Sequence, residues 1–203
     1  MAEDTGRITI RRSLPAGAER RAAELYWEAF GRKLGAALNP PEKAVPFIAA
    51  HLNADRAVCA LMDGRLVGLA GYQVGGRSFT GGTVTDVLRE YGWIGGLWRV
   101  PLLALFERQV ASGQLVMDGI AVDGEARGRG LGSLLLEEIA AVAAEHGRRE
   151  IRLDVIDVNT RARALYERRG FTAVRTVRTP YLRRLMGFGA VTTMRRPVPG
   201  KGR

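Results

Sequence analysis

The chain has one cysteine and two histidines among its 203 residues, and this scarcity excludes several classes of site. Cys59 alone forms no intramolecular disulfide and supplies no thiolate cluster for zinc. It lies in the apolar stretch AVCALM, which favours a buried structural cysteine over a nucleophile. His51 and His146 are far apart, near the ends of predicted helices, which disfavours a Ser-His-Asp or Cys-His enzyme. We therefore expect no metal site and no catalytic thiol.

Long hydrophobic runs are also lacking. The first twelve residues, MAEDTGRITIRR, contain no apolar core of a signal peptide. The most apolar window, Trp93 to Phe106, includes Arg99 and Pro101 and is too short to span a bilayer. We expect a cytoplasmic protein with no membrane partner.

Basic residues outnumber acidic ones, 31 Lys and Arg against 21 Asp and Glu, for a net charge of +10. This balance raises the likelihood of a polyanionic partner, which could be a nucleic acid, an acidic lipid surface or a phosphorylated cofactor. The arginines are spread along the chain, so a solvated basic surface explains them equally well. The sequence lacks the aromatic and basic interleaving of an RNA-binding sheet and any recognisable recognition helix. We therefore expect no nucleic-acid partner.

The spacing of apolar residues predicts a single α/β domain over 1–196, followed by a flexible basic tail over 197–203. Asp63-Gly64 between two apolar runs predicts a hairpin. The other expected elements are strands at 7–12, 115–122, 150–156, 171–177 and 191–196, and helices at 16–34, from Pro40 to about 52, at 132–146 and at 160–169.

Residues 77–112 are less regular and are predicted to form a helical insertion before the fourth strand. Glycines separate two helical patches, 86–94 and 100–112. The insertion could pack in the core, form a homodimer contact or wall a substrate pocket. Four aromatic residues are candidates either for that wall or for the core: Trp27, Tyr91, Trp93 and Tyr181.

The glycine-rich stretch Arg127-Gly128-Arg129-Gly130-Leu131-Gly132 precedes a predicted helix directly. Glycine permits a positive φ and allows another molecule to approach the backbone closely. Unpaired N–H groups and the positive end of the helix dipole meet at such a position, which suits a phosphate. The two arginines would add charge-assisted hydrogen bonds. The pattern therefore indicates an anion site, most plausibly for a diphosphate.

Two familiar diphosphate loops do not fit this stretch. The phosphate-binding loop of nucleotide hydrolases needs Lys followed by Ser or Thr, and the sequence contains neither pair. A dinucleotide-binding loop needs Gly or Ala where Ser133 stands, and its first glycine should end the strand, whereas 123–127 intervene here. A glycine-rich turn that merely caps a core helix is the remaining alternative without a ligand.

The residues 127–132 match the pattern Q/R-x-x-G-x-G/A and resemble the pyrophosphate loop of the GNAT superfamily of acyl-CoA-dependent N-acyltransferases. A second block, from Asn159 to Phe171, resembles that family's N-x-x-A-x-x-L-Y-x-x-x-G-F segment, and the two blocks stand in the family's order and separation. The resemblance is specific over about 114–175 and weak over 77–112 and the C-terminus. It implies a GNAT-type mixed central β-sheet flanked by helices, and an N-acetyltransferase that uses acetyl-CoA.

The resemblance also implies roles for individual residues. Main-chain groups of the fourth strand would bind the pantetheine arm, and the loop would bind the pyrophosphate of coenzyme A. Tyr166 would act as the general acid that protonates the departing thiolate. The implied cofactor-binding residues are Ile120, Ala121, Val122, Arg127, Gly128, Arg129, Gly130, Leu131, Gly132 and Asn159.

Two of these assignments have alternatives. Asn159 either hydrogen-bonds the pantetheine amide or caps the helix over 160–169, or does both. Asp118 is the candidate general base, because simple alternation gives it the facing of Ile120, but it could equally be a structural hydrogen-bonding group. Glu28 is a second candidate base, and a water chain could replace both.

The acceptor is expected to be an amine of a small molecule or a peptide. A non-catalytic acyl-CoA-binding regulatory module is the first alternative function, and in that case Tyr166 would be replaceable while Arg129 and Gly130 would not. A basic nucleic-acid-binding protein is the second, less favoured alternative, which a steep salt dependence of DNA or RNA binding would support.

Overall fold

The computed structural model describes residues 6–104, 110–180 and 183–199. The first half contains β1 (Ile8–Arg11), α1 (Glu19–Leu38), α2 (Pro41–Ala50), β2 (Ala57–Met62), β3 (Arg65–Gln73) and α3 (Val84–Ala104). The second half contains β4 (Gln114–Val122), α4 (Leu131–Glu145), β5 (Glu150–Ile156), α5 (Thr160–Arg168), β6 (Thr172–Arg178), α6 (Arg183–Met186) and β7 (Ala190–Pro197). Short 3₁₀ turns, η1 (Ala54–Arg56) and η2 (Gly124–Ala126), precede β2 and follow β4.

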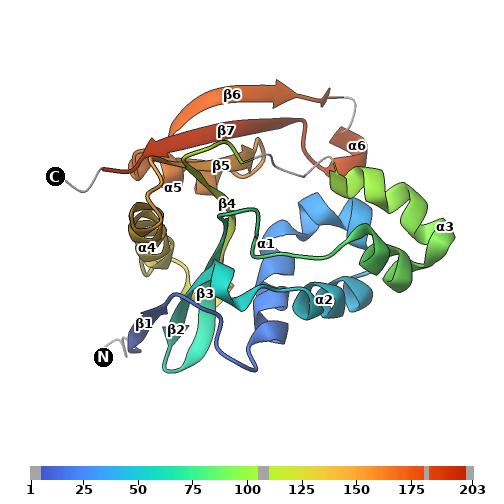
Figure 1. The fold of residues 1–203 in the computed structure, drawn as a ribbon, viewed down its shortest axis with the longest axis horizontal. Coiled ribbons are helices and arrows are strands. Elements are labelled where there is room, and N and C mark those ends of the chain that lie inside the picture. Colours follow the sequence, from blue (N-terminus) through green and yellow to red (C-terminus); the bar gives the residue numbers. More distant parts are fainter. Residues whose placement is uncertain (1–5, 105–109, 181–182, 200–203) are drawn as a thin grey trace.

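Across these described ranges, seven strands form one sheet in the order β1-β2-β3-β4-β5-β7-β6. Neighbouring strands are antiparallel, with the exception of the parallel pair β4 and β5. This mixed sheet with helices on both faces is the expected fold class (Figure 1). Asp63 and Gly64 have φ values of 50° and 81° and connect β2 to β3, which confirms the predicted hairpin.

Alternating residues of β2 supply two separate cores, one on each face of the sheet. Ala57, Cys59 and Leu61 pack with α1, α2 and the start of α3, whereas Val58 and Ala60 pack with α4. The four residues predicted to share the buried face of α4 are all buried: Leu131, Leu135, Ile139 and Val142. Figure 1 shows α4 on one side of the sheet and the three N-terminal helices on the other.

The expected insertion over 77–112 is helical only in part. The two helical patches form one element, α3, which is interrupted at Gly92, where the backbone adopts φ 73° and ψ 165°. Residues 110–112 are not helical, so the second patch was predicted too long, and 105–109 lie outside the described residues. Before α3, Val74 bridges to Arg77 and Leu52 to Thr80, so the insertion begins as extended chain.

The last strand, β7, and the residue after it extend slightly beyond 196, the predicted end of the domain. Pro197 is the last residue of β7, and the buried Val198 donates its main-chain N–H to the Arg149 carbonyl at 2.9 Å. Residues 200–203 of the expected tail lie outside the described part. The loop predicted between β6 and β7 contains the short helix α6, which was not predicted.

Candidate active site at the opening between β4 and β5

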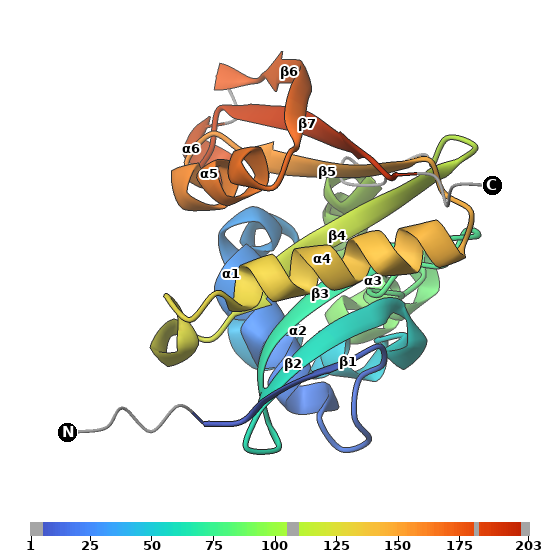
Figure 2. The same cartoon turned by 90° about the vertical axis from the view of Figure 1, so that its left-hand side faces the viewer.

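The two parallel strands β4 and β5 pair over only three residues each. Gln114–Val116 pairs with Glu150–Arg152, although β4 continues to Val122 and β5 to Ile156. Figure 2 shows the strands meeting at one end and diverging toward the end where α4 begins. Beyond Val116 and Arg152, the described parts of β4 and β5 are no longer paired with each other. An extended molecule can therefore join the sheet between them as an added strand.

A β-bulge at Asp118 lies at the start of this opening. The register against β3 changes from Gly71 opposite Gly119 to Tyr72 opposite Met117, so Asp118 is the extra residue. Simple alternation does not hold across a bulge, so it cannot establish whether Asp118 shares the facing of Ile120, and that facing stays a prediction. The Asp118 Oδ2 atom accepts a hydrogen bond from the Phe79 N–H at 2.9 Å, which supports the structural alternative for this carboxylate.

Two glycines opposite each other make room for aromatic rings beside the bulge. A Cβ on Gly119 would overlap the ring of Phe30, and a Cβ on Gly71 would lie 2.8 Å from the Cβ of Phe79. The ring of Tyr26 lies 4.6 Å from that of Phe30 and 6.1 Å from that of Phe79. These three rings form an aromatic layer on β3 and β4, which sequence reasoning missed because it depends on strand register.

The glycine-rich loop has the backbone conformation that its sequence predicts at two positions. Gly128 and Gly130 have φ values of 82° and 76°, and no atom lies within 4 Å of a Cβ built on either residue. Gly132 differs, because it lies in the first turn of α4, where a Cβ would be 2.9 Å from Leu165 Cδ2 of α5. A side chain at Gly132 would make the end of Leu165 move, so this glycine favours close helix packing and does not serve a positive φ.

The loop presents donors to open space. In the described part of the chain, no group accepts a hydrogen bond from the main-chain N–H of Gly128, Arg129 or Gly130. Both arginine side chains are exposed: Arg127 Nε donates to the Val122 carbonyl at 3.2 Å, and Arg129 Nη1 lies 3.5 Å from Met62 Sδ. Free N–H groups, two guanidinium groups and a helix N-terminus together fit a polyphosphate.

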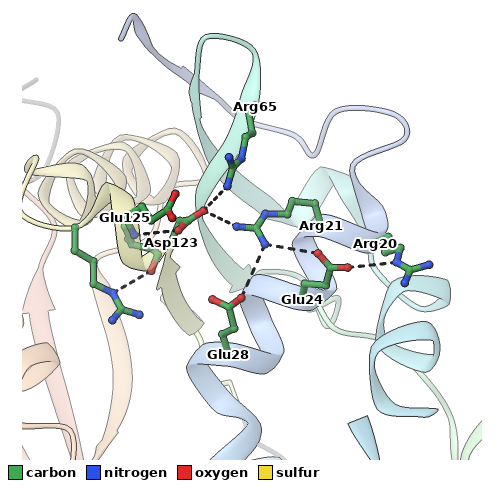
Figure 3. Close-up of polar contacts among 9 residues, drawn as sticks. Arg20, Arg21, Glu24, Glu28, Arg65, Asp123 and Glu125 are labelled. Carbon is green, nitrogen blue, oxygen red and sulfur yellow. Dashed lines mark hydrogen bonds and ion pairs between the residues drawn. The ribbon is translucent and has the colours of Figure 1, made fainter. Parts of the chain in front are cut away.

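Asp123 anchors the segment between β4 and this loop (Figure 3). Its Oδ2 atom accepts hydrogen bonds from Arg21 of α1 at 2.5 Å and from Arg65 of β3 at 3.0 Å. Its Oδ1 atom accepts the Glu125 N–H at 3.1 Å, and its own N–H donates to the Val67 carbonyl at 2.8 Å. The Glu125 N–H, together with the two guanidinium groups, holds the pKa of the Asp123 carboxyl below its usual value.

Sequence reasoning missed both Arg21 and Asp123. An Asp followed by Gly after a strand is a turn signal that could have identified Asp123. Arg21 is one of many arginines, and its partner is 102 residues away, so no local pattern could identify it. Figure 3 also shows Arg21 between Glu24 and Glu28, whose carboxylates lie 3.6 Å and 3.9 Å from Arg21 Nη1.

The start of α5 lies after the opening, at the end of β5. Asn159 caps this helix, because its side-chain oxygen accepts the Ala162 N–H at 3.2 Å. The capping alternative is therefore confirmed, and binding of pantetheine by Asn159 stays a prediction. Tyr166 is buried, and its ring lies 5.8 Å from that of Phe171. Since Leu165 contacts the first turn of α4, α5 and the loop are held side by side.

The cysteine and the four aromatic residues singled out in the sequence differ in how far their side chains are buried. Cys59 is fully buried, and burial raises the pKa of its thiol to about 12. Tyr91 donates its hydroxyl to the Leu38 carbonyl at 2.6 Å, and burial raises its pKa to about 12. Trp93 is 78% exposed and belongs to neither core. Trp27 packs at the edge of the N-terminal core, and Tyr181 lies outside the described residues.

No three His, Cys, Asp or Glu side chains within 6–104, 110–180 and 183–199 are grouped as a metal site. No helix in those ranges is both long and apolar enough to cross a membrane.

The fold agrees with comparisons to known proteins. A model of the acetyltransferase (GNAT) family matches residues 20–171. A search of curated proteins gives no match. Among solved structures, a GCN5-related N-acetyltransferase from Kribbella flavida is 18% identical, with 94% of this chain and 97% of that chain covered and a TM-score of 0.62.

A second similar structure, an agmatine N-acetyltransferase, is 21% identical, with 94% of this chain and 99% of that chain covered and a TM-score of 0.64. At these identities the two structures show a shared fold. The family model covers most of the chain, including the opening between the strands, the glycine-rich loop and Tyr166. The chain therefore belongs to the acetyltransferase (GNAT) family and is an acyltransferase.

Proposed function

We propose that the protein transfers the acetyl group of acetyl-CoA to an amine by direct attack of the amine on the thioester. The observation that carries this proposal is the opening between β4 and β5, which leads directly into the glycine-rich loop. The opening offers main-chain hydrogen bonds to the pantetheine arm, and the glycine-rich loop next to it offers a site for the pyrophosphate of coenzyme A. The two sites follow one another in the same order as the two parts of the cofactor.

The binding roles follow the chain. Main-chain groups of Ile120, Ala121 and Val122 pair with the pantetheine arm, which takes the place of a strand beside β4. The loop residues bind the pyrophosphate through their N–H groups, with charge assistance from the two arginine side chains. Asn159 caps α5 through its oxygen, and its amide nitrogen donates to the pantetheine.

The chemical step forms a C–N bond and breaks the C–S bond. The amine nitrogen attacks the thioester carbonyl carbon, and a main-chain N–H of β4 stabilises the negative charge that develops on the carbonyl oxygen. The thiolate of coenzyme A then leaves and takes the hydroxyl proton of Tyr166. A tyrosine with pKa near ~10 and a thiol with pKa near ~8.5 are close enough for this transfer when a hydrogen bond is in place.

The amine must lose a proton, and Asp118 is the proposed acceptor. Its carboxylate lies at the bulge, beside the residues that hold the thioester, and it already fixes Phe79 through one oxygen. Glu28 is the less favoured base, because it is exposed and lies close to the Arg21 guanidinium.

Calorimetric titration with acetyl-CoA tests the proposal, with NAD and ATP as control ligands. We expect binding of acetyl-CoA, and its loss in Gly130→Glu, where a carboxylate and a disfavoured backbone conformation would face the pyrophosphate. Gly76→Glu is the matched control, because Gly76 also has a positive φ, 79°, with open space around it. Gly76 follows β3 at the end of the sheet that lies away from the glycine-rich loop. Failure of the wild-type protein to bind acetyl-CoA would refute the proposal.

A further inference from the structure

A cavity of about 480 Å³ lies between α1, α2 and α3, and none of the residues discussed for catalysis lines it. Its wall is formed by apolar residues of the three helices and by the segment that leads into α3. The lining residues are Tyr26, Leu34, Leu38, Phe47, Ile48, Thr80, Gly81, Gly82, Thr83, Val84, Val87 and Val100. The cavity opens to solvent at its rim, where Val84 is 54% exposed, and its volume falls within the range of ligand sites.

The cavity is suited to an uncharged, apolar group. None of its lining residues carries a charge. Its polar side chains are those of Tyr26, Thr80 and Thr83, and the hydroxyl of Thr83 is already engaged, since it donates to Asp86 Oδ2 at 2.6 Å. An ammonium group among the apolar side chains would lose its hydration and find no carboxylate among the lining residues, whereas an alkyl or aryl group would lose only unfavourable contact with water.

The aromatic layer lies between the cavity and the opening between β4 and β5. Tyr26 lines the cavity and contacts Phe30, which covers Gly119 at the bulge. On the other side, Phe79 is fixed to Asp118, and the chain continues from Phe79 directly into the cavity wall at Thr80. One layer of rings therefore separates the apolar cavity from the strand at which the proposed acetyl transfer takes place.

We propose that this cavity holds the apolar part of the acceptor, so that the substrate is an amine with an alkyl or aryl group and no second charge on that group. The proposal rests on the proposed acetyltransferase function for the amine, but the cavity can be tested without catalysis. The amine lies toward Asp118 and the bulge, and the apolar group lies beyond Tyr26 among α1, α2 and α3.

Direct calorimetric titration of the protein with n-alkylamines from propylamine to octylamine, without acetyl-CoA, tests the cavity. Diamines of equal length serve as control ligands, because their second ammonium group would enter the apolar space. We expect the Kd of the alkylamines to fall by about fourfold for each added methylene and that of the diamines to stay flat. The kcat/KM for acetylation should rise with chain length in parallel.

Two variants locate the site. Val87→Phe fills the cavity from α3, and Val84→Lys places a charge at its exposed rim, where Val84 is 54% exposed and tolerates a polar residue. Ile94→Lys is the matched control, because Ile94 lies in α3 beyond the break at Gly92, is 91% exposed and does not line the cavity. We expect the dependence on chain length to vanish in the first two variants and to persist in the third. If Val87→Phe does not fold, the result with Val84→Lys alone tests whether the alkyl group binds in the cavity.

The outcomes separate this inference from the proposed function. A protein that binds acetyl-CoA and acetylates amines without any dependence of Kd on chain length would overturn the cavity proposal alone. A dependence that persists in both cavity variants would also overturn it, since the alkyl group would then bind elsewhere. A protein that binds long alkylamines in the cavity but binds no acetyl-CoA would support the proposal for the cavity. It would refute the proposed transfer of an acetyl group from acetyl-CoA.

Discussion

The carboxylate of Asp123, at the end of β4, accepts a hydrogen bond from the guanidinium of Arg21 in α1 at 2.5 Å. This contact joins the strand that leads into the glycine-rich loop to the helix that carries Phe30. The same carboxylate fixes the first turn of the loop through the Glu125 N–H. The position of the proposed pyrophosphate site therefore depends on a charged contact between segments 102 residues apart.

Arg21→Met should loosen this contact. The side chain of Asp123 is 10% exposed, so removal of Arg21 leaves a mostly buried carboxylate with only Arg65 and the Glu125 N–H to stabilise its charge. We expect the free energy of unfolding to fall by about 1–3 kcal/mol and the Kd for acetyl-CoA to rise severalfold. Urea denaturation and calorimetry measure the two effects.

Arg20→Met is the control for that change, because Arg20 is 87% exposed and forms an i,i+4 pair with Glu24 at 3.3 Å. Loss of such an exposed pair should change the free energy of unfolding by less than ~0.5 kcal/mol. Equal effects of the two substitutions would show that Arg21 acts only as a surface charge.

The depressed pKa of Asp123 predicts a dependence of stability on pH. A carboxyl with a lowered folded-state pKa stabilises the protein fully above its unfolded-state value, 3.8 here, and this contribution disappears as the pH falls through the lower folded-state pKa. Wild type should be more stable than Asp123→Asn at pH 7, and the difference should shrink below about pH 4. A difference that is constant from pH 7 to pH 3 would contradict the shift.

Much of the strand and helix order could be predicted from the sequence, because it depends on local patterns. The alternation of AVCALM, the Asp63-Gly64 turn and the apolar face of α4 are each contained within one segment. The glycine-rich loop was predicted for the same reason. Its two positive φ values lie at Gly128 and Gly130, directly before the helix.

What the sequence could not predict depends on register and on distant partners. The bulge at Asp118 is defined only by the pairing of β4 with β3. Because of it, alternation along β4 cannot be used to predict which way Asp118 faces relative to Ile120. Gly132 resembles its neighbours in sequence but serves helix packing, because Leu165 lies against it. The cavity between the three N-terminal helices likewise arises from packing, to which each helix contributes a few ordinary apolar residues.

Cys59 should be unreactive in the native protein. It is fully buried and its thiol has a pKa of about 12, so thiolate is nearly absent at neutral pH. An aromatic disulfide reagent should therefore modify Cys59 only after denaturation in urea, and Cys59→Ala should retain acetyltransferase activity. Rapid modification of the native protein would mean that β2 opens readily. If Cys59 is inert, the same reagent can follow release of coenzyme A without background.

Tyr166→Phe should lower turnover and leave cofactor binding intact. Phenylalanine keeps the ring packed beside Phe171 and removes only the hydroxyl, which is the proposed proton donor. We expect kcat to fall by about 10- to 1000-fold, with little change in the Kd for acetyl-CoA. Steady-state kinetics and calorimetry on the same preparation provide the measurement. Unchanged kcat would remove Tyr166 from the mechanism and leave it a core residue.

Asp118→Asn and Asp118→Ala together separate a general base from a structural acceptor. Asparagine retains an oxygen that can accept the Phe79 N–H but cannot take up a proton at neutral pH. If Asp118 is the base, both variants should lose kcat by about 10²-fold or more, and the acidic limb of the pH profile should disappear. Full activity in Asp118→Asn with loss in Asp118→Ala would instead assign the carboxylate to holding Phe79. In that case the alkylamine titrations would also change in Asp118→Ala, because the segment after Phe79 forms the cavity wall.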